Sequence, residues 1–351
     1  MKRAPQAALL PDGRRLHLQD GPIDLVIEAF GAGEAVKAAY AAAARRFTGM
    51  LDELCGELAL LRAPARPGPS PLAGPVARRM HAAVAPFAAE TFITPMAAVA
   101  GAVAEEILAA MTAAAPLAKA YVNNGGDIAL HLAAGEGFTV GLVDRPDRPS
   151  LFGRTRIAAA DGIRGIATSG RHGRSFSLGI ADAVTVLART AAEADAAATV
   201  IANAVDLPGH PAVTRLPARD LQPDSDLGDR PVTRAVAALT PAEIEKALAR
   251  GLAAAERLVG TGLVAAAALH LSGETWVTGC EAGRVIPFPS TARSPGAGND
   301  ARQPDSATCV EPGRRPEPVL TPGQRLRRLR DDGGRRSRLA HHEEQQGSVH
   351  A

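Results

Sequence analysis

Helix-like segments cluster early in the chain and strand-like segments cluster in its middle, without regular alternation. Separate runs of helices and strands favour an α+β fold with a mainly antiparallel sheet. A hydrophobic fraction of 46% over 351 residues is enough for one large core or two modest ones. We therefore expect helices that pack against an antiparallel sheet.

Capping signals and hydrophobic periodicity predict the main elements. Thr94 before Pro95 indicates a capped helix start, and so does Thr240 before Pro241. The T-x-x-E pattern of residues 190–193 is a capping box, which predicts a helix that starts near residue 191. The other expected helices lie within 33–61, with a break near Thr48-Gly49, and within 76–88. The expected strands lie within 23–29, 138–143, 155–160, 183–188, 263–273 and 275–279. We expect a polar connection at residues 208–229.

The stretch YVNNGGDIAL, residues 121–130, places two amides, two glycines and a carboxylate between two apolar runs. Asn-Gly is a strong hairpin signal, and the spacing alone favours a plain hairpin. The alternative is a ligand site, because Gly125 and Gly126 permit positive φ and successive amides can converge on an anion. Asp127 would then be free to hold a hydroxyl, a ring nitrogen or a cation.

A second segment, GIATSGRHGRS at residues 165–175, places hydroxyls and glycines beside basic side chains. Thr168 and Ser169 precede Gly170, and Arg171 and Arg174 follow it. Hydroxyls and open amides near arginines suit phosphate, although an ordinary polar loop has the same composition.

A third segment, EADAAATVIANA, places Asp195 and Thr199 four residues apart on a predicted helix, so the two side chains share a face. A carboxylate and a hydroxyl are hard oxygen donors of the kind that Mg²⁺ accepts. The alternative is that Thr199 bonds back to the carbonyl of Asp195 and that Asp195 only favours the helix N-terminus.

Together, these segments resemble the ApbE-like superfamily of flavin transferases, and within it the branch catalogued as uncharacterised protein family 0280. The resemblance covers about residues 16–279. The stretches that carry the closer match are TPMAAVAGAVAEEI (94–107), NNGGDIAL (123–130), GIATSG (165–170), FSLGIADAVTVLA (176–188), EADAAATVIANAV (193–205) and SDLGDRPVT (225–233).

The characterised ApbE-like enzymes bind FAD and, with Mg²⁺, transfer its FMN half to a threonine of a partner protein. The resemblance therefore implies FAD and Mg²⁺ as cofactors, a small-molecule nucleotide as ligand and a protein as acceptor. By the same resemblance, the metal ligands would be Asp195 and Thr199, and the flavin nucleotide would contact Asn124, Gly125, Gly126, Asp127, Thr168, Ser169 and Gly170.

One segment departs from the superfamily pattern. The characterised enzymes have an H-x-x-D-P-x-T-G segment after the TSG loop, whereas residues 171–182 read RHGRSFSLGIAD. Three functions therefore stay open: a Mg²⁺-dependent flavin transferase, a nucleotide-binding protein without catalysis, and an enzyme that acts on a different phosphorylated substrate. In the third, His172 would be a general acid or base, because imidazole titrates near neutrality; a solvent-exposed loop residue is the alternative.

Composition bears on partners and location. A formal net charge of +2 and an aromatic fraction of 3% give no sign of nucleic-acid binding. The most apolar window, residues 96–115, carries Glu105 and Glu106 near its centre, which argues against a membrane-spanning helix. Because the N-terminal apolar stretch is too short for a signal peptide, we expect a cytoplasmic protein. Small-residue helices and apolar strands are compatible with a homodimer.

The composition changes near residue 286, where apolar residues become rare and periodicity ends. We therefore predict a single α+β domain at residues 1–285 and a disordered, basic and proline-rich tail at residues 286–351.

Overall fold

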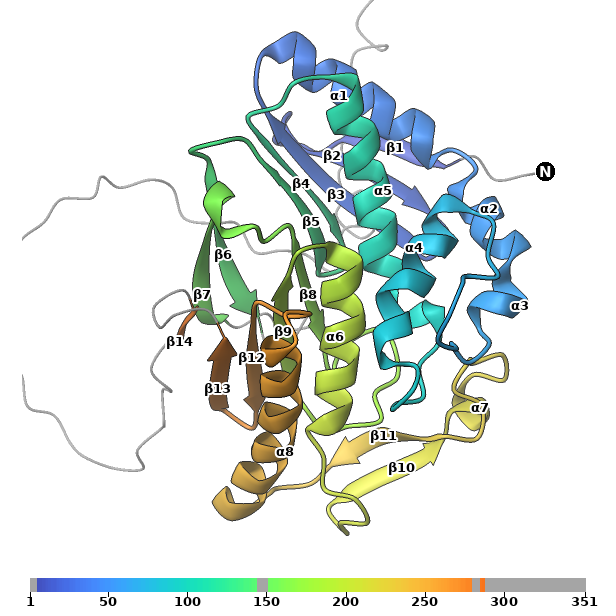
Figure 1. Ribbon diagram of the computed structural model, residues 1–351, viewed down its shortest axis with the longest axis vertical. Coiled ribbons are helices and arrows are strands. Elements are labelled where there is room, and N and C mark those ends of the chain that lie inside the picture. Colours follow the sequence, from blue (N-terminus) through green and yellow to red (C-terminus); the bar gives the residue numbers. More distant parts are fainter. Residues whose placement is uncertain (1–4, 144–150, 280–284, 288–351) are drawn as a thin grey trace, which may run out of the picture. The chain divides into compact units, whose positions relative to one another are not determined.

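The computed structural model describes residues 5–143, 151–279 and 285–287 (Figure 1). Its strands are β1 (Gln6–Leu9), β2 (Leu16–Asp20), β3 (Ile23–Phe30), β4 (Lys119–Asn124), β5 (Asp127–Leu132), β6 (Gly137–Val143), β7 (Leu151–Ala158), β8 (Gly165–Ser169), β9 (Ala183–Ala188), β10 (Val213–Pro217), β11 (Pro231–Val236), β12 (Ala266–Leu271), β13 (Glu274–Gly279) and β14 (Val285–Pro287). Its α-helices are α1 (Gly33–Phe47), α2 (Met50–Gly56), α3 (Leu58–Leu61), α4 (Pro75–Val84), α5 (Val99–Ala114), α6 (Ala191–Ala204), α7 (Ala218–Leu221) and α8 (Pro241–Gly260), with 3₁₀ turns η1 (Ala85–Phe87), η2 (Pro95–Ala98) and η3 (Ala159–Asp161).

The predicted α+β class with a mainly antiparallel sheet is confirmed. In the part of the chain that the structure describes, the largest sheet has nine strands in the order β1-β2-β3-β4-β5-β8-β9-β12-β13. Every neighbouring pair in this sheet is antiparallel. Strands β14, β7 and β6 form a three-stranded sheet, and β10 pairs with β11.

Burial explains which strands lie at the centre of the large sheet. Strand β3 alternates between buried and partly buried residues, which is typical of a strand with one covered face. Every residue of β9 and of β12 is buried. One face of these strands contributes to the core that includes α5 and α6, and the other contributes to a smaller apolar cluster with residues of β6 and β7.

The predicted helix starts at residues 191 and 241 are confirmed. The Thr190 hydroxyl accepts a hydrogen bond from the Glu193 amide, and Thr240 and Glu243 form a reciprocal capping box. The predicted break near Thr48-Gly49 is also confirmed, because Gly49 has a φ of 82° between α1 and α2.

Two local predictions were wrong. The Thr94 side chain does not cap a helix; it donates its hydroxyl to Asp226, and the α-helix begins only at Val99, after η2. The segment 208–229 is not a plain connection, because it contains β10 and α7. Strand β10 pairs with β11 across a sequence separation that local patterns do not reveal. The predicted tail lies outside the described residues except for the end of β14, and the domain boundary stays a prediction.

The stretch Pro95–Ala114 is long and apolar enough to cross a membrane when judged by length and composition alone. Here it is a core helix. Ala102, Val103, Ala104 and Ile107 are fully buried in the main apolar cluster, which they share with the large sheet. The small side chains of this helix therefore allow close packing against the sheet and α6. Figure 1 shows α5 beside α6 on one face of this sheet, in agreement with the contacts between the two helices.

Candidate functional site

The NNGGD stretch is a tight hairpin. Asn124 of β4 pairs with Asp127 of β5, and only Gly125 and Gly126 connect the two strands. Their φ angles are 68° and 116°, which a residue with a side chain rarely adopts. The Asn123 side chain accepts a hydrogen bond of 2.8 Å from the Gly126 amide and stabilises the turn. The hairpin interpretation is thus confirmed, and the role of its side chains depends on what lies beside it.

The TSG loop lies next to this hairpin because β8 pairs with β5. Asp127 Oδ1 accepts a hydrogen bond of 3.3 Å from the Thr168 amide. The Thr168 hydroxyl lies 2.9 Å from the Thr185 hydroxyl on β9, directly across the strand pair. Gly170 follows the strand and approaches the backbone of Asp182 so closely that a Cβ at position 170 would lie 2.9 Å from the Asp182 carbonyl carbon.

Helices α5 and α6 bring Asp195 to the same place. Gly101 of α5 packs directly on the backbone at the start of α6. This contact lets Asp195 Oδ2 accept a hydrogen bond of 3.0 Å from the Gly101 amide. The preceding carbonyl, that of Ala100, accepts a hydrogen bond of 3.2 Å from Asn124 Nδ2. The N-terminal turn of α5 therefore holds one side chain from the hairpin and one from α6.

Asp127 and Asp195 influence each other electrostatically. Burial raises the pKa of Asp127 to about 7, although the Thr168 amide and the Arg174 guanidinium oppose the rise. Burial also raises the pKa of Asp195 well above its ordinary value, and the neighbouring carboxyl of Asp127 raises it further. Two buried carboxyls whose pKa values are both raised favour either bound protons or a bound cation.

Two more oxygens match the needs of a cation. Asn124 Oδ1 is buried and has no hydrogen-bond partner among the described residues, while Asn124 Nδ2 donates to the Ala100 carbonyl. Among the hydrogen bonds of the described residues, none joins the Thr199 hydroxyl to the carbonyl four residues earlier, whereas Thr48 and Thr112 make such a bond. Among the residues that the structure describes, no group of three or more His, Cys, Asp or Glu side chains is arranged to hold a metal ion. A metal here would need amide, hydroxyl or ligand oxygens in addition to the carboxylates, and such oxygens suit Mg²⁺.

The basic residues after the TSG loop divide into two groups. Arg171 and His172 both contact Asp182, whose Oδ1 lies 2.8 Å from Arg171 Nε and 3.1 Å from His172 Nε2. The other carboxylate oxygen of Asp182 accepts a hydrogen bond from the Ser272 amide. The interpretation of His172 as a solvent-exposed residue was wrong, because its side chain is only 20% exposed and has this partner.

Arg174 is placed differently from Arg171. Its guanidinium lies over Gly125, and Nη1 donates a hydrogen bond of 3.2 Å to the carbonyl of Pro22. Within the described ranges it makes no ion pair with a carboxylate, although it lowers the pKa of Asp127 through its charge. The loop motif indicated two arginines near phosphate without distinguishing them; only the tertiary contacts identify Arg174 as the cation beside the turn.

We expect the metal-free protein to lose stability as the pH rises through neutrality. The two carboxyls have ordinary pKa values of 3.8 and raised values in the folded state, so the folded state binds more protons than the unfolded state. Their contribution is therefore complete below about pH 4 and is lost as the pH passes about 7. Urea unfolding in the presence of a chelator, at several pH values between these limits and above, measures this effect.

Asp195→Asn is the matched variant for that measurement. It should show a flatter pH dependence than the wild-type protein, because it removes one of the two titrating carboxyls and its effect on the other. Identical pH dependence in the two proteins would show that the carboxyls do not interact as inferred.

A family model described as AbpE bacteria matches residues 7–277 of this chain. The chain is 44% identical over 129 residues to a UPF0280 protein of Methanopyrus kandleri, covering 36% of this chain and 48% of the relative. It is 40% identical over 134 residues to a UPF0280 protein of Methanothrix thermoacetophila, covering 38% of this chain and 53% of the relative. The matched parts thus span about half the length of these relatives.

Among solved structures, the chain matches the apo crystal structure of the Pseudomonas stutzeri flavinyl transferase ApbE. The TM-score is 0.40 and the sequence identity is 10%, with coverage of 80% of this chain and 96% of the other. The assignment of the fold rests on the strand pairings described above and not on this match.

Proposed function

This chain belongs to the AbpE bacteria family, as a UPF0280 member of the ApbE-like superfamily, and we propose that it binds a flavin or a related pyrophosphate nucleotide together with Mg²⁺. The observation that carries the proposal is the group of oxygens from three separate elements beside one turn. Within the part of the chain that the structure describes, Asn124 Oδ1 is buried without a partner, and the carboxyls of Asp127 and Asp195 are both harder to ionise than usual. A divalent cation would give Asn124 Oδ1 a partner and would favour the ionised form of both carboxyls.

The turn and its neighbours supply what the phosphates would need. Gly126 has open space around the position of a Cβ atom, so its backbone can approach a ligand closely. Arg174 offers a guanidinium that is not neutralised by a carboxylate in the described part of the chain, and guanidinium groups bind phosphate oxygens well. Ser169 and Gly170 directly follow Thr168 at the end of β8. Mg²⁺ held by Asp195 and Thr199 would offset the negative charge of a bound pyrophosphate.

The reaction that we propose is FMN transfer to a hydroxyl of a protein acceptor. The acceptor oxygen forms a bond to the FMN phosphorus, the pyrophosphate bond breaks, and AMP leaves. The hydroxyl proton must pass to a base. His172 is the candidate, because Asp182 contacts its Nε2 and would hold the imidazole in one orientation, which leaves Nδ1 free to accept a proton.

A nucleotide-binding protein without catalysis is the second candidate. The specific observation in its favour is that Asp182, the carboxylate beside His172, also contacts Arg171 and the Ser272 amide. In this second candidate, the shared carboxylate fixes the loop after Gly170 and does not orient a base. The missing D-P-x-T-G sequence points in the same direction.

The test is to titrate FAD into the full-length protein with and without Mg²⁺, following flavin fluorescence, and then to separate the nucleotides by chromatography. Mg²⁺-dependent binding with release of AMP is the expected result for a transferase. Mg²⁺-dependent binding without AMP supports the non-catalytic candidate. Absence of flavin binding under both conditions would contradict the flavin proposal and direct the search to other phosphorylated ligands.

We expect His172→Gln to slow AMP release by about 10²- to 10⁴-fold, the usual contribution of a general base. Flavin affinity should change little, because Arg174 and the GGD turn are untouched. The rate of AMP release is measured in both proteins at the same FAD and Mg²⁺ concentrations. A variant with the wild-type rate would leave His172 with only a structural role.

A further inference from the structure

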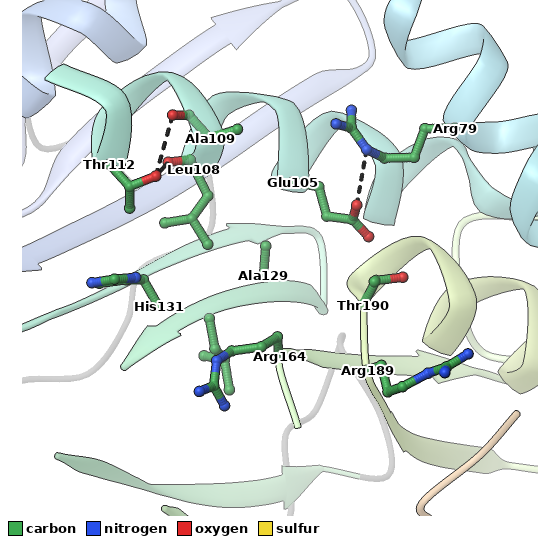
Figure 2. Close-up of a pocket in the computed structure, with 11 residues that line it drawn as sticks. Arg79, Glu105, Leu108, Ala109, Thr112, Ala129, His131, Arg164, Arg189 and Thr190 are labelled. Atoms are coloured by element: carbon green, nitrogen blue, oxygen red, sulfur yellow. Dashed lines mark hydrogen bonds and ion pairs between the residues drawn. The ribbon is translucent and has the colours of Figure 1, made fainter. Parts of the chain in front are cut away.

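A separate pocket of about 380 Å³ lies between α5, strand β5 and the segments that lead into β8 and α6 (Figure 2). None of Asn124, Asp127, Thr168 and Asp195 lines it. Its α5 residues, from Glu105 to Thr112, follow Gly101 along the helix, and its residues near α6 precede that helix. The pocket is therefore distinct from the site described above.

The pocket lies where the pairing between β5 and β8 ends. Strand β5 pairs with β8 only at Ile128 and Ala129, and the next contact is from the Leu130 amide to the Arg164 carbonyl. Gly165 permits the loop before α6 to pass close by, since a Cβ at this position would collide with the backbone of Thr190 and Ala191. The opening that results has an apolar lining from Leu108, Ala109 and Ala129.

The charges on the rim are not balanced. Arg79 is matched by Glu105, with 2.9 Å between Nε and the carboxylate, so this pair contributes no net charge. Arg164 donates to the carbonyls of Ile163 and Ala159 at 2.8 and 3.0 Å, which fix its guanidinium, and within the described ranges it has no carboxylate partner.

A second cation lies on the same rim. Arg189 is 69% exposed, and in the described part of the chain its carboxylate partner is Glu193, at 3.4 Å. Figure 2 shows Arg164 and Arg189 on the side of the pocket opposite α5. The rim thus keeps an excess of positive charge beside an apolar lining.

We propose that this pocket binds a small organic anion, with its apolar part on Leu108, Ala109 and Ala129 and its carboxylate or phosphate on one of the two arginines, Arg164 or Arg189, whose guanidinium groups point to different sides of the pocket (Figure 2). The volume lies within the range of about 300–1,000 Å³ that is usual for small-molecule sites, and such sites combine an apolar lining with a few polar groups. The site requires neither FAD nor Mg²⁺, so a test of anion binding at this pocket is independent of the proposed function.

The experiment is isothermal titration calorimetry of the full-length protein with phenyl phosphate, benzoate, inorganic phosphate and phenol. Saturable one-to-one binding is expected for phenyl phosphate or benzoate, and the stronger of the two identifies the anion. Inorganic phosphate lacks the apolar part and phenol lacks the charge, so both should bind more weakly. At least one of Arg164→Gln and Arg189→Gln should weaken binding about tenfold or more, and the variant that does so identifies the arginine that holds the anion.

Two further variants locate the binding. Arg250→Gln changes an exposed arginine on α8, far from the pocket residues in sequence and absent from its lining, and should bind like the wild-type protein. Ala109→Phe adds a ring at an exposed position of α5, where folding is not at stake, and should block the pocket. Absence of binding by both aromatic anions, or binding that persists in all three pocket variants, overturns the proposal.

Discussion

Gly101→Ala is expected to destabilise the protein by about 1–3 kcal/mol or more, even though alanine is the better helix former. A Cβ at position 101 would lie 2.5 Å from the carbonyl carbon of Ala191 and 2.8 Å from the amide nitrogen of Ala192, and closer still to the Ala191 oxygen. These are backbone atoms at the start of α6, so no side-chain rotation can relieve the collision. The two helices must separate, which disturbs the fully buried alanines between them.

Gly33→Ala is the matched control, because Gly33 also lies near the start of a long helix and has open space where the Cβ would be. Chemical denaturation of both variants measures the difference. The control should be neutral or slightly more stable than the wild-type protein. Equal stability of Gly101→Ala and the wild-type protein would mean that α5 and α6 do not cross as closely as described.

Asp195→Asn is expected to remove most of the Mg²⁺-dependent part of flavin binding. The substitution keeps an oxygen that can accept from the Gly101 amide, but it removes the charge that would face the cation. Loss of a buried, hydrogen-bonded charge from such a site costs on the order of 2–5 kcal/mol, or more than about 30-fold in affinity. Fluorescence titration of FAD with and without Mg²⁺ measures it.

The same variant should be more stable than the wild-type protein when Mg²⁺ is absent and the pH is above neutrality. Under those conditions the wild-type protein must keep two carboxylates near each other, and the variant keeps one. This opposite effect separates loss of the metal site from general misfolding. Asp220→Asn changes an exposed carboxylate on α7 and should alter neither property. If Asp195→Asn keeps the full effect of Mg²⁺, the assignment of Asp195 as a metal ligand is wrong.

The crossing of α5 and α6 connects the two sites on opposite sides of Gly101. On one side, the Gly101 amide donates to Asp195; on the other, Glu105 accepts a hydrogen bond of 2.7 Å from the Ala192 amide. Burial raises the pKa of Glu105, which the Ala192 amide and Arg79 oppose. The start of α6 is thus fixed by hydrogen bonds to both the candidate nucleotide site and the anion pocket.

Local signals were sufficient where the structure depends on neighbours in the chain. The hairpin at Gly125-Gly126 follows from the conformations that only glycine adopts easily, and the start of α6 follows from the Thr190 cap. Thr94 carries the same kind of signal but does not cap a helix. Its hydroxyl instead donates a hydrogen bond to Asp226, which is far along the chain. Strand β10 was missed for the same reason, since its partner β11 follows a helix and a loop.

The sequence alone therefore determined the α+β class, the position of the GGD turn, most helix starts and the set of residues that resemble the ApbE-like motifs. Only the tertiary structure decided which of those side chains meet. It placed Asp127 near Asp195, left Asn124 Oδ1 buried without a partner in the described ranges, and separated Arg174 from Arg171. It also created the anion pocket, whose residues come from five separate segments and form no motif. The physical reason is that turns and caps depend on backbone geometry within a few residues, whereas burial and charge pairing depend on packing between distant elements.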